Sequence, residues 1–137
     1  LLDLKAMDGA VHTEYTGVDN VTILRNARRL GQVLAARPSR EPQANYGVWV
    51  RVPVIPGVND SDDNLRRTAR FARDEIGPAV QAIELLGYHT LGGAKLQKLG
   101  AGPRMEAVEP LTREQLPGRA AVVENELAGS GIAVRFR

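Results

Sequence analysis

The sequence predicts an α/β fold in which parallel strands alternate with helices. Four segments have the composition of strands, residues 1–7, 48–55, 80–86 and 132–136, and helical patterns lie between them. Strands that alternate with helices pair in parallel through right-handed crossovers. A chain of 137 residues, 43% of them hydrophobic, can bury one core, so we expect residues 1–137 to form a single domain.

The predicted strands end at residues that turn the chain. Residues 1–7 interleave apolar side chains with Asp3 and Lys5 and lead into an Asp-Gly turn. Residues 48–55 are rich in β-branched side chains and almost continuously apolar, which is typical of a parallel strand covered on both faces. A Pro-Gly pair follows that strand, and a Gly-Ser-Gly segment precedes the last one.

Capping residues mark the beginnings of the first two helices. Asp19 or Asn20 is expected to cap the first, which ends before Pro38, and Asp60 or Ser61 is expected to cap the second. Apolar residues recur at helical spacing after each cap, so both segments are predicted to lay one face on the sheet.

The rest of the chain has weaker signals. Thr112 and Gln115 resemble a capping box, and the Pro-Gly pair at 117–118 is expected to delay or kink the helix that follows. Residues 37–47 are rich in loop formers and have no apolar periodicity, which predicts a surface loop. A long loop is also predicted after the third strand.

Composition excludes several classes of function. With 18 Lys and Arg against 16 Asp and Glu, a net charge of +2 gives no electrostatic case for nucleic acid or an anionic membrane. No apolar run approaches the roughly 20 residues that span a bilayer, and we expect a soluble, cytoplasmic protein. The chain has no Cys, so this segment alone can hold no disulfide, thiolate zinc site or iron–sulfur cluster. It begins with Leu in mid-pattern, from which we expect that its N-terminus is a cut.

Ionisable residues interrupt the predicted strands, in a fold class whose functional residues lie at the carboxyl ends of strands. Asp3 and Lys5 are two positions apart and would share a face, Arg51 and Glu84 interrupt the next two strands, and His89 follows the third. These residues would form one polar patch at the interior or mouth of a barrel. In the alternative interpretation, Asp3 with Lys5 and Arg51 with Glu84 are structural ion pairs, and His89 is an ordinary loop histidine.

Four segments of the chain resemble the pyruvate formate-lyase-activating enzymes in order and spacing: LLDLKAMD, TGVDN, VWVRVPVIPGVNDSDDNL and IELLGYHTLGGAKLQKLG. The resemblance covers nearly the whole chain. It implies a partial (β/α) barrel of the radical S-adenosylmethionine type, with six main parallel strands. This chain matches the C-terminal part, from the fourth strand to the C-terminal helix and strand, without the N-terminal cluster-binding half.

The resemblance also implies a reaction and its partners. Enzymes of this family cleave S-adenosylmethionine reductively with a [4Fe–4S] cluster, and the deoxyadenosyl radical removes hydrogen from a backbone glycine of a glycyl radical enzyme such as pyruvate formate-lyase. A C-x-x-x-C-x-x-C loop that this chain lacks holds the cluster, and a donor such as flavodoxin or ferredoxin supplies the electron. The segment alone is therefore expected to be inactive. The alternative is a non-catalytic scaffold that binds the glycyl-radical partner.

Five residues of the S-adenosylmethionine pocket follow from the resemblance. Asp3, Leu4 and Lys5 match the family's D-L-K, whose Asp and Lys lie beside the methionyl moiety and whose backbone contributes to the pocket. Arg51 matches an arginine inside the barrel, and His89 matches a histidine that reaches the nucleoside.

The chain departs from the family pattern at two positions, Gly87 in place of Pro and Leu96 in place of Trp, and Gly87 would loosen the aim of His89. A barrel cut before the first strand would leave that strand as an open edge. It would also uncover Val50, Val52 or their neighbours, together with Arg51 and Glu84. Open edges and apolar surface drive association, so we expect the fragment to self-associate.

Overall fold

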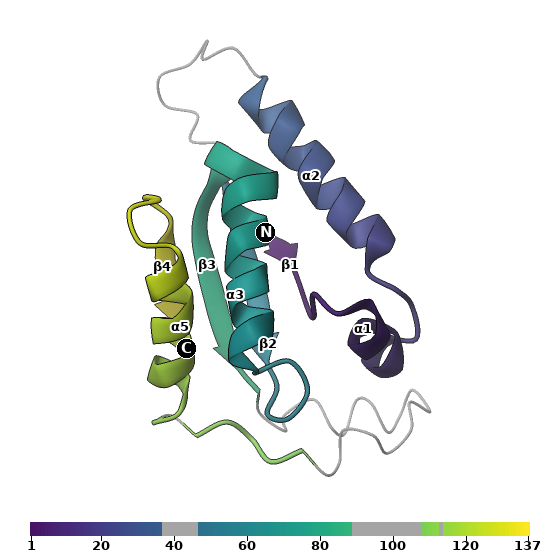
Figure 1. The fold of residues 1–137 in the computed structure, drawn as a ribbon, viewed down its shortest axis with the longest axis vertical. Helices are drawn as coiled ribbons and strands as arrows, with labels where there is room; N and C mark the ends of the chain where they lie inside the picture. The colour runs from purple at the N-terminus through teal and green to yellow at the C-terminus, as the bar shows by residue number, and fades with distance from the viewer. Residues whose placement is uncertain (37–46, 89–107, 113) are drawn as a thin grey trace.

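The computed structural model describes residues 1–36, 47–88, 108–112 and 114–137. Within these residues four strands form one parallel sheet in the order β1-β2-β3-β4 (Figure 1). The strands are β1 (Leu2–Asp3), β2 (Val48–Val54), β3 (Val80–Gly87) and β4 (Ala133–Phe136). The predicted α/β class and parallel pairing are confirmed.

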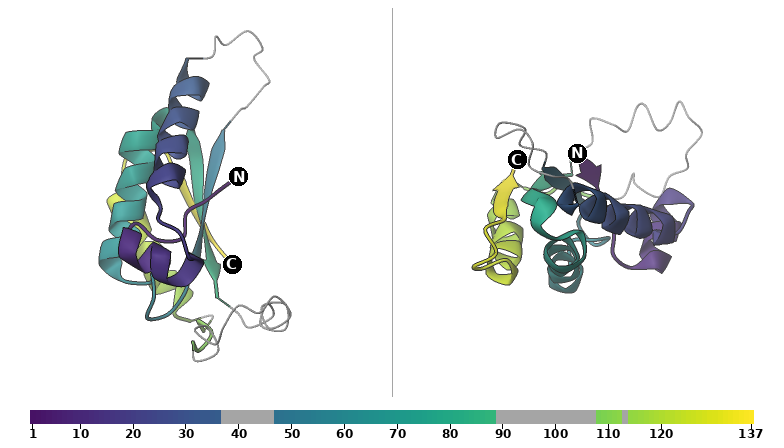
Figure 2. Two further views of the ribbon diagram at one scale, coloured as in Figure 1. Left: turned by 90° about the vertical axis from the view of Figure 1, so that its right-hand side faces the viewer. Right: turned by 90° about the horizontal axis from the view of Figure 1, so that it is seen from above.

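The described helices follow the strands in the chain. They are α1 (Gly9–Thr16), α2 (Val21–Ala35), α3 (Asp62–Arg70), the π-helical turn η1 (Phe71–Ile76), the 3₁₀ turn η2 (Gly77–Ala79) and α5 (Leu116–Glu126). Figure 2 shows that α2, α3 and α5 lie on one face of the sheet, and that α1 lies to the side of the sheet, level with the carboxyl ends of the strands. None of the described helices is long and apolar enough to cross a membrane.

The core lies between the sheet and this layer of helices. Along β2, every second side chain from Val48 to Val54 is buried, and Trp49, Arg51 and Pro53 between them are partly exposed. Because side chains alternate across a strand, the buried valines face the helices and the others face the opposite side. The expectation that β2 is covered on both faces is wrong for the described residues. Val50 and Val52 are buried, and the exposure expected for them or their neighbours falls on the neighbours.

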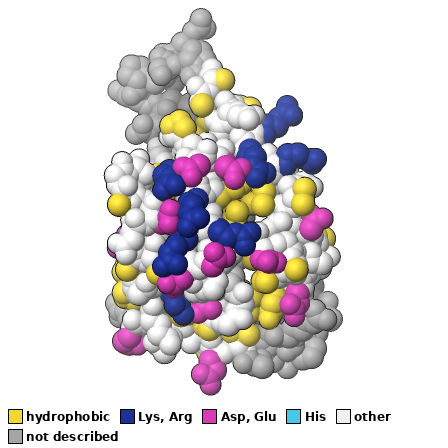
Figure 3. Space-filling model, viewed as in Figure 1, with side chains coloured by type: hydrophobic (Ala, Val, Ile, Leu, Met, Phe, Trp, Pro, Cys, Tyr) yellow, Lys and Arg dark blue, Asp and Glu magenta, His cyan; other side chains and the backbone are white. Residues whose placement is uncertain are grey.

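The outer surface of the helices is charged. Figure 3 shows acidic and basic side chains mixed across this face, over α3 and α5. Ion pairs account for much of the pattern, including Arg66 with Asp62 at 3.1 Å and Arg70 with Glu126 at 3.0 Å. A mixed, paired surface of this kind is typical of a face in contact with water.

Local capping explains where the helices begin. Asp19 Oδ1 accepts a hydrogen bond from the Val21 amide at 3.0 Å, so Asp19 satisfies the start of α2, and the Asn20 side chain is turned elsewhere. Ser61 caps α3 as predicted, accepting from the Asn64 amide at 3.2 Å. Pro117 lies in the first turn of α5, where a missing N–H costs nothing, so it does not delay the helix.

Helix α1 was not predicted, because its sequence has no clear apolar stripe. The Asp-Gly pair interpreted as a turn is its beginning: Asp8 Oδ1 accepts from the Ala10 and Val11 amides at 2.8 and 3.0 Å. The hydrogen bond from the Val11 amide, and after it the one from the Ala10 amide, has the largest effect in holding the pKa of the Asp8 carboxyl below its ordinary value. Gly17, at a φ of 82°, ends the helix in the left-handed conformation that glycine favours.

Helix α2 approaches the end of η1 very closely at Gly31. A Cβ atom at this position would lie 2.1 Å from the carbonyl oxygen of Ile76, which is far inside van der Waals contact. Glycine therefore lets the two helical segments pack against each other over the buried Phe71 and Ala72.

Candidate functional site

A buried asparagine in the turn after β2, Asn59, holds the backbone just after the end of β1. Its Nδ2 donates to the carbonyl oxygen of Lys5 and, at 2.6 Å, to that of Pro53, and its Oδ1 accepts from the Ile55 amide at 2.7 Å. The residue is 2% exposed, and every donor and acceptor of its side-chain amide faces protein. Asn59 thus joins the carboxyl ends of β1 and β2.

Two further asparagines hold the next residues of the same segment. Asn64 of α3 accepts from the Met7 amide at 2.8 Å and donates to the Asn59 carbonyl at 2.7 Å. Asn20 donates to the carbonyls of Ala6 and Met7 at 3.0 and 3.1 Å. We call Asn20, Asn59 and Asn64 the asparagine clamp; all three are buried.

The clamp explains why β1 is shorter than the predicted strand of residues 1–7. After the Leu4 amide bonds the Arg51 carbonyl at 2.9 Å, the backbone of Lys5, Ala6 and Met7 bonds to asparagine side chains and not to a neighbouring strand. The clamp was not predicted, because the sequence position of Asn20 indicates only a helix cap. The signal present was the repeated asparagine in the segments that follow a strand or a turn.

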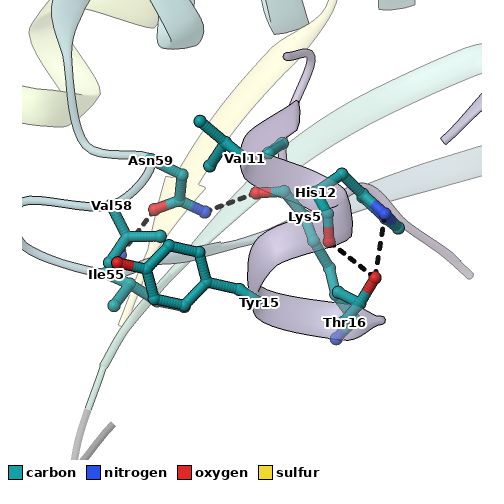
Figure 4. Close-up of a pocket in the computed structure, with 9 residues that line it drawn as sticks. Lys5, Val11, His12, Tyr15, Thr16, Ile55, Val58 and Asn59 are labelled. Atoms are coloured by element: carbon teal, nitrogen blue, oxygen red, sulfur yellow. Dashed lines mark hydrogen bonds between the residues drawn. The ribbon is translucent and has the colours of Figure 1, made fainter. Parts of the chain in front are cut away.

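A pocket of about 340 Å³ opens where this segment meets α1 and the turn after β2 (Figure 4). Its lining combines apolar walls with a few polar groups: Lys5, Ala6, Val11, His12, Tyr15, Thr16, Ile55, Val58 and Asn59. The pocket lies at the carboxyl ends of β1 and β2, the edge at which parallel α/β folds place their ligands.

His12, on the wall of this pocket, fastens the end of α1. Its Nδ1 lies 2.7 Å from the Val18 carbonyl oxygen and 3.0 Å from Thr16 Oγ1, and the residue is 3% exposed. A carbonyl oxygen can only accept, so Nδ1 donates to the Val18 carbonyl. Thr16 Oγ1 also donates to the His12 carbonyl at 2.7 Å, which closes the turn.

The face of the sheet opposite the helices carries a row of charges. The strand register places Asp3 beside Arg51, Arg51 beside Glu84, and Glu84 beside Arg135. We call Asp3, Arg51, Glu84 and Arg135 the charged row; its signs alternate from strand to strand. Of the residues predicted to form one polar patch, Asp3, Arg51 and Glu84 therefore do lie in neighbouring positions on the sheet.

Ion pairing within the row differs from the prediction. Arg51 Nε lies 2.8 Å from Asp3 Oδ1, and Glu84 pairs at 3.2 Å with Arg137, beyond β4. Arg135 stacks over the Trp49 ring, 4.3 Å from its centre, across the small Ala82. The proposed pairs of Asp3 with Lys5 and of Arg51 with Glu84 are wrong, because the register and the reach of the side chains favour the other partners.

The predicted site residues divide into three groups. Asp3 and Arg51 are brought together, and Leu4 is buried beneath them with 3% exposure. Lys5 is exposed, lines the pocket and makes no ion pair with any described residue. His89 lies outside the described residues, and no group of three His, Asp or Glu side chains among the described residues could hold a metal.

The curated proteins that this chain resembles in sequence include activating enzymes of two kinds. The chain is 34% identical over 124 residues to pyruvate formate-lyase 1-activating enzyme of Escherichia coli K12, covering 90% of this chain and 45% of that protein. It is 33% identical over 122 residues to the indoleacetate decarboxylase activating enzyme of Tractidigestivibacter scatoligenes, covering 89% of this chain and 35% of that protein. The chain thus spans less than half the length of these curated relatives. No protein-family model matches it.

A solved structure shares the fold. A domain of pyruvate-formate lyase-activating enzyme from Bacteroides vulgatus superposes with a TM-score of 0.67 and 23% identity, covering 98% of this chain and 64% of that one. This likeness supports a partial barrel of the expected type. Over about nine tenths of its length the chain is thus similar in sequence to part of the pyruvate formate-lyase-activating enzymes and related activating enzymes, and it shares the fold of the solved domain.

Proposed function

We propose that this chain is part of an activase that uses S-adenosylmethionine and a [4Fe–4S] cluster to form a glycyl radical on pyruvate formate-lyase or a related enzyme. The observation that carries the proposal is the rim at the ends of β1 and β2. There a clamped backbone presents the ammonium of Lys5, which pairs with no described anion, in a segment that matches activating enzymes in sequence.

The residues present fit a methionyl group. A carboxylate attracts a lysine ammonium that has no other anionic partner, and Lys5 has none among the described residues. Asp3 is 47% exposed at its side chain and uses Oδ1 for Arg51, which leaves its second carboxylate oxygen to accept from an ammonium group. Arg51 fixes the orientation of Asp3, and Leu4 supplies the buried backbone between the two charged residues.

The cluster does not fit these 137 residues. Its ligands are thiolates, and the chain has no Cys, so the ligands would have to come from outside this sequence. When bound, the cluster would supply the electron that cleaves S-adenosylmethionine. We infer that a flavodoxin or ferredoxin delivers this electron in the cytoplasm, and that the partner is a glycyl radical enzyme.

The test is the affinity of the complete protein for S-adenosylmethionine, measured by titration calorimetry. We expect Lys5→Ala to weaken binding about tenfold or more, because it removes a charge-assisted contact to a carboxylate. His89→Ala should weaken it less, by about fivefold, since only a neutral hydrogen bond is lost. Arg66→Ala, on the outer face of α3, is the matched control and should leave affinity unchanged. A larger loss in His89→Ala than in Lys5→Ala would refute the role of Lys5.

A further inference from the structure

We propose that Asn59 is a positioning residue for the S-adenosylmethionine site: by holding the Lys5 carbonyl, it sets the direction in which the Lys5 ammonium reaches the ligand. The inference rests on the function proposed for Lys5. It concerns a residue whose side-chain amide bonds only to protein groups.

The hydrogen bonds of Asn59 fix its side-chain amide in one orientation. Both Nδ2 hydrogens are used, one by the Lys5 carbonyl and one by the Pro53 carbonyl, and Oδ1 accepts from the Ile55 amide. A rotated amide would point Oδ1 at two carbonyl oxygens and leave the buried Ile55 amide without its acceptor. The side chain therefore fixes the Lys5 peptide relative to the end of β2.

The position of the Lys5 side chain depends on this anchor. The Lys5 ammonium has no ion pair among the described residues, and the residue is exposed, so its long side chain is not held at its tip. What is held is its base, because the bonded carbonyl is attached to the Lys5 Cα. Rotation of this peptide would swing the Cα–Cβ bond and move the ammonium at the far end of a four-carbon stem.

Asn20 provides a matched control within the same clamp. It is also buried, at 5% exposure, and its Nδ2 also donates to two carbonyls. Those carbonyls belong to Ala6 and Met7, one and two residues beyond Lys5. Loss of Asn20 should therefore cost stability as loss of Asn59 does, without releasing the Lys5 peptide directly.

The experiment is a double-mutant cycle in the complete protein, with S-adenosylmethionine affinity measured by calorimetry and stability by thermal unfolding. We expect Asn59→Ala to weaken affinity about fivefold and Asn20→Ala to leave it within about twofold, at similar losses of melting temperature. In a Lys5→Ala background, Asn59→Ala should bring no further loss, because the position of an absent ammonium cannot matter. Asn59→Ser, which can still donate one bond, should recover part of the affinity and serves if Asn59→Ala does not fold.

Each outcome decides between explanations. Equal losses of affinity in Asn20→Ala and Asn59→Ala, or additive losses in the double variant, would show a general structural effect and overturn the positioning role alone. If Lys5→Ala itself leaves affinity unchanged, the function proposed for Lys5 fails and the positioning role fails with it.

Discussion

Arg51 Nε lies 2.8 Å from Asp3 Oδ1, across the register pair that joins β1 to β2. The contact links two residues that the sequence resemblance assigns to the same ligand pocket. It lies on the sheet face that the described helices leave open, in a row with Glu84 and Arg135.

The pair should contribute little to folding. Both side chains are partly exposed, and exposed ion pairs typically contribute about 0.2–1 kcal/mol. We therefore expect Asp3→Asn and Arg51→Met each to lower the free energy of unfolding by about 1 kcal/mol or less. A double-mutant cycle by urea denaturation measures this, and a coupling energy above about 2 kcal/mol would show a structural pair instead.

Asp8 should make the free energy of unfolding depend on pH in the acid range. The Val11 and Ala10 amides hold the pKa of its carboxyl below the ordinary value, so the folded state favours the charged form. The resulting stabilisation is present above the pKa of the unfolded chain, about 4, and is lost as pH falls through the lower folded value. Asn keeps the cap without the charge, so Asp8→Asn should melt below the wild type at pH 7.

The comparison at lower pH completes this test. Melting temperatures of the two proteins should converge as pH falls through the lowered pKa of Asp8 in the folded state. A gap between them that stays constant as pH falls from 7 into the acid range would show that the charge of Asp8 contributes nothing.

Gly31 should not tolerate a methyl group. Alanine would place Cβ 2.1 Å from the Ile76 carbonyl, so Gly31→Ala is expected to cost about 1–3 kcal/mol despite the better helix propensity of alanine. Gly118 in α5 is the matched control, because a Cβ atom added there would meet no atom within 4 Å. Gly118→Ala should be neutral or stabilising by up to about 1 kcal/mol. Equal effects of the two substitutions in chemical denaturation would contradict the close packing of α2 on η1.

The edge of the sheet at β1 should promote self-association of the 137-residue chain. Among the described residues β1 pairs only with β2, and Leu1 beside it is 81% exposed. Leu1→Lys adds a charge to this edge and should reduce association. Light scattering measures both proteins across a range of concentrations. A wild-type chain that stays monomeric at high concentration would contradict this prediction.

The strongest predictions from the sequence concerned elements with a clear pattern. The apolar run of residues 48–55 and the Ser61 cap predicted the bounds of β2 and the start of α3 within a residue or two, because strand composition and capping are local properties. Helix α1 was missed although Asp8 and Gly17 mark its two ends, since its apolar residues form no stripe. For a helix of this kind the two capping residues are the sequence signal, not the periodicity.

The geometry of the site depends on contacts that the sequence does not reveal. Asn59 and Lys5 are 54 positions apart, and Asp3 and Arg51 are 48 apart. Their meeting is set by the register of β1 on β2, which a shift of one residue would destroy. The sequence predicted that Asp3, Arg51 and Glu84 lie near one another, but it did not predict which ion pairs they form.

The central claim is that this chain belongs to an activase that forms a glycyl radical. The direct measurement is anaerobic electron paramagnetic resonance of the complete protein, with its cluster reconstituted, mixed with reductant, S-adenosylmethionine and the glycyl radical enzymes of its own source organism. The account predicts a glycyl radical signal on one of these enzymes, greatly reduced in Lys5→Ala and retained in Arg66→Ala. Tight binding to a partner without any radical, or a radical that forms equally well in Lys5→Ala, would contradict it.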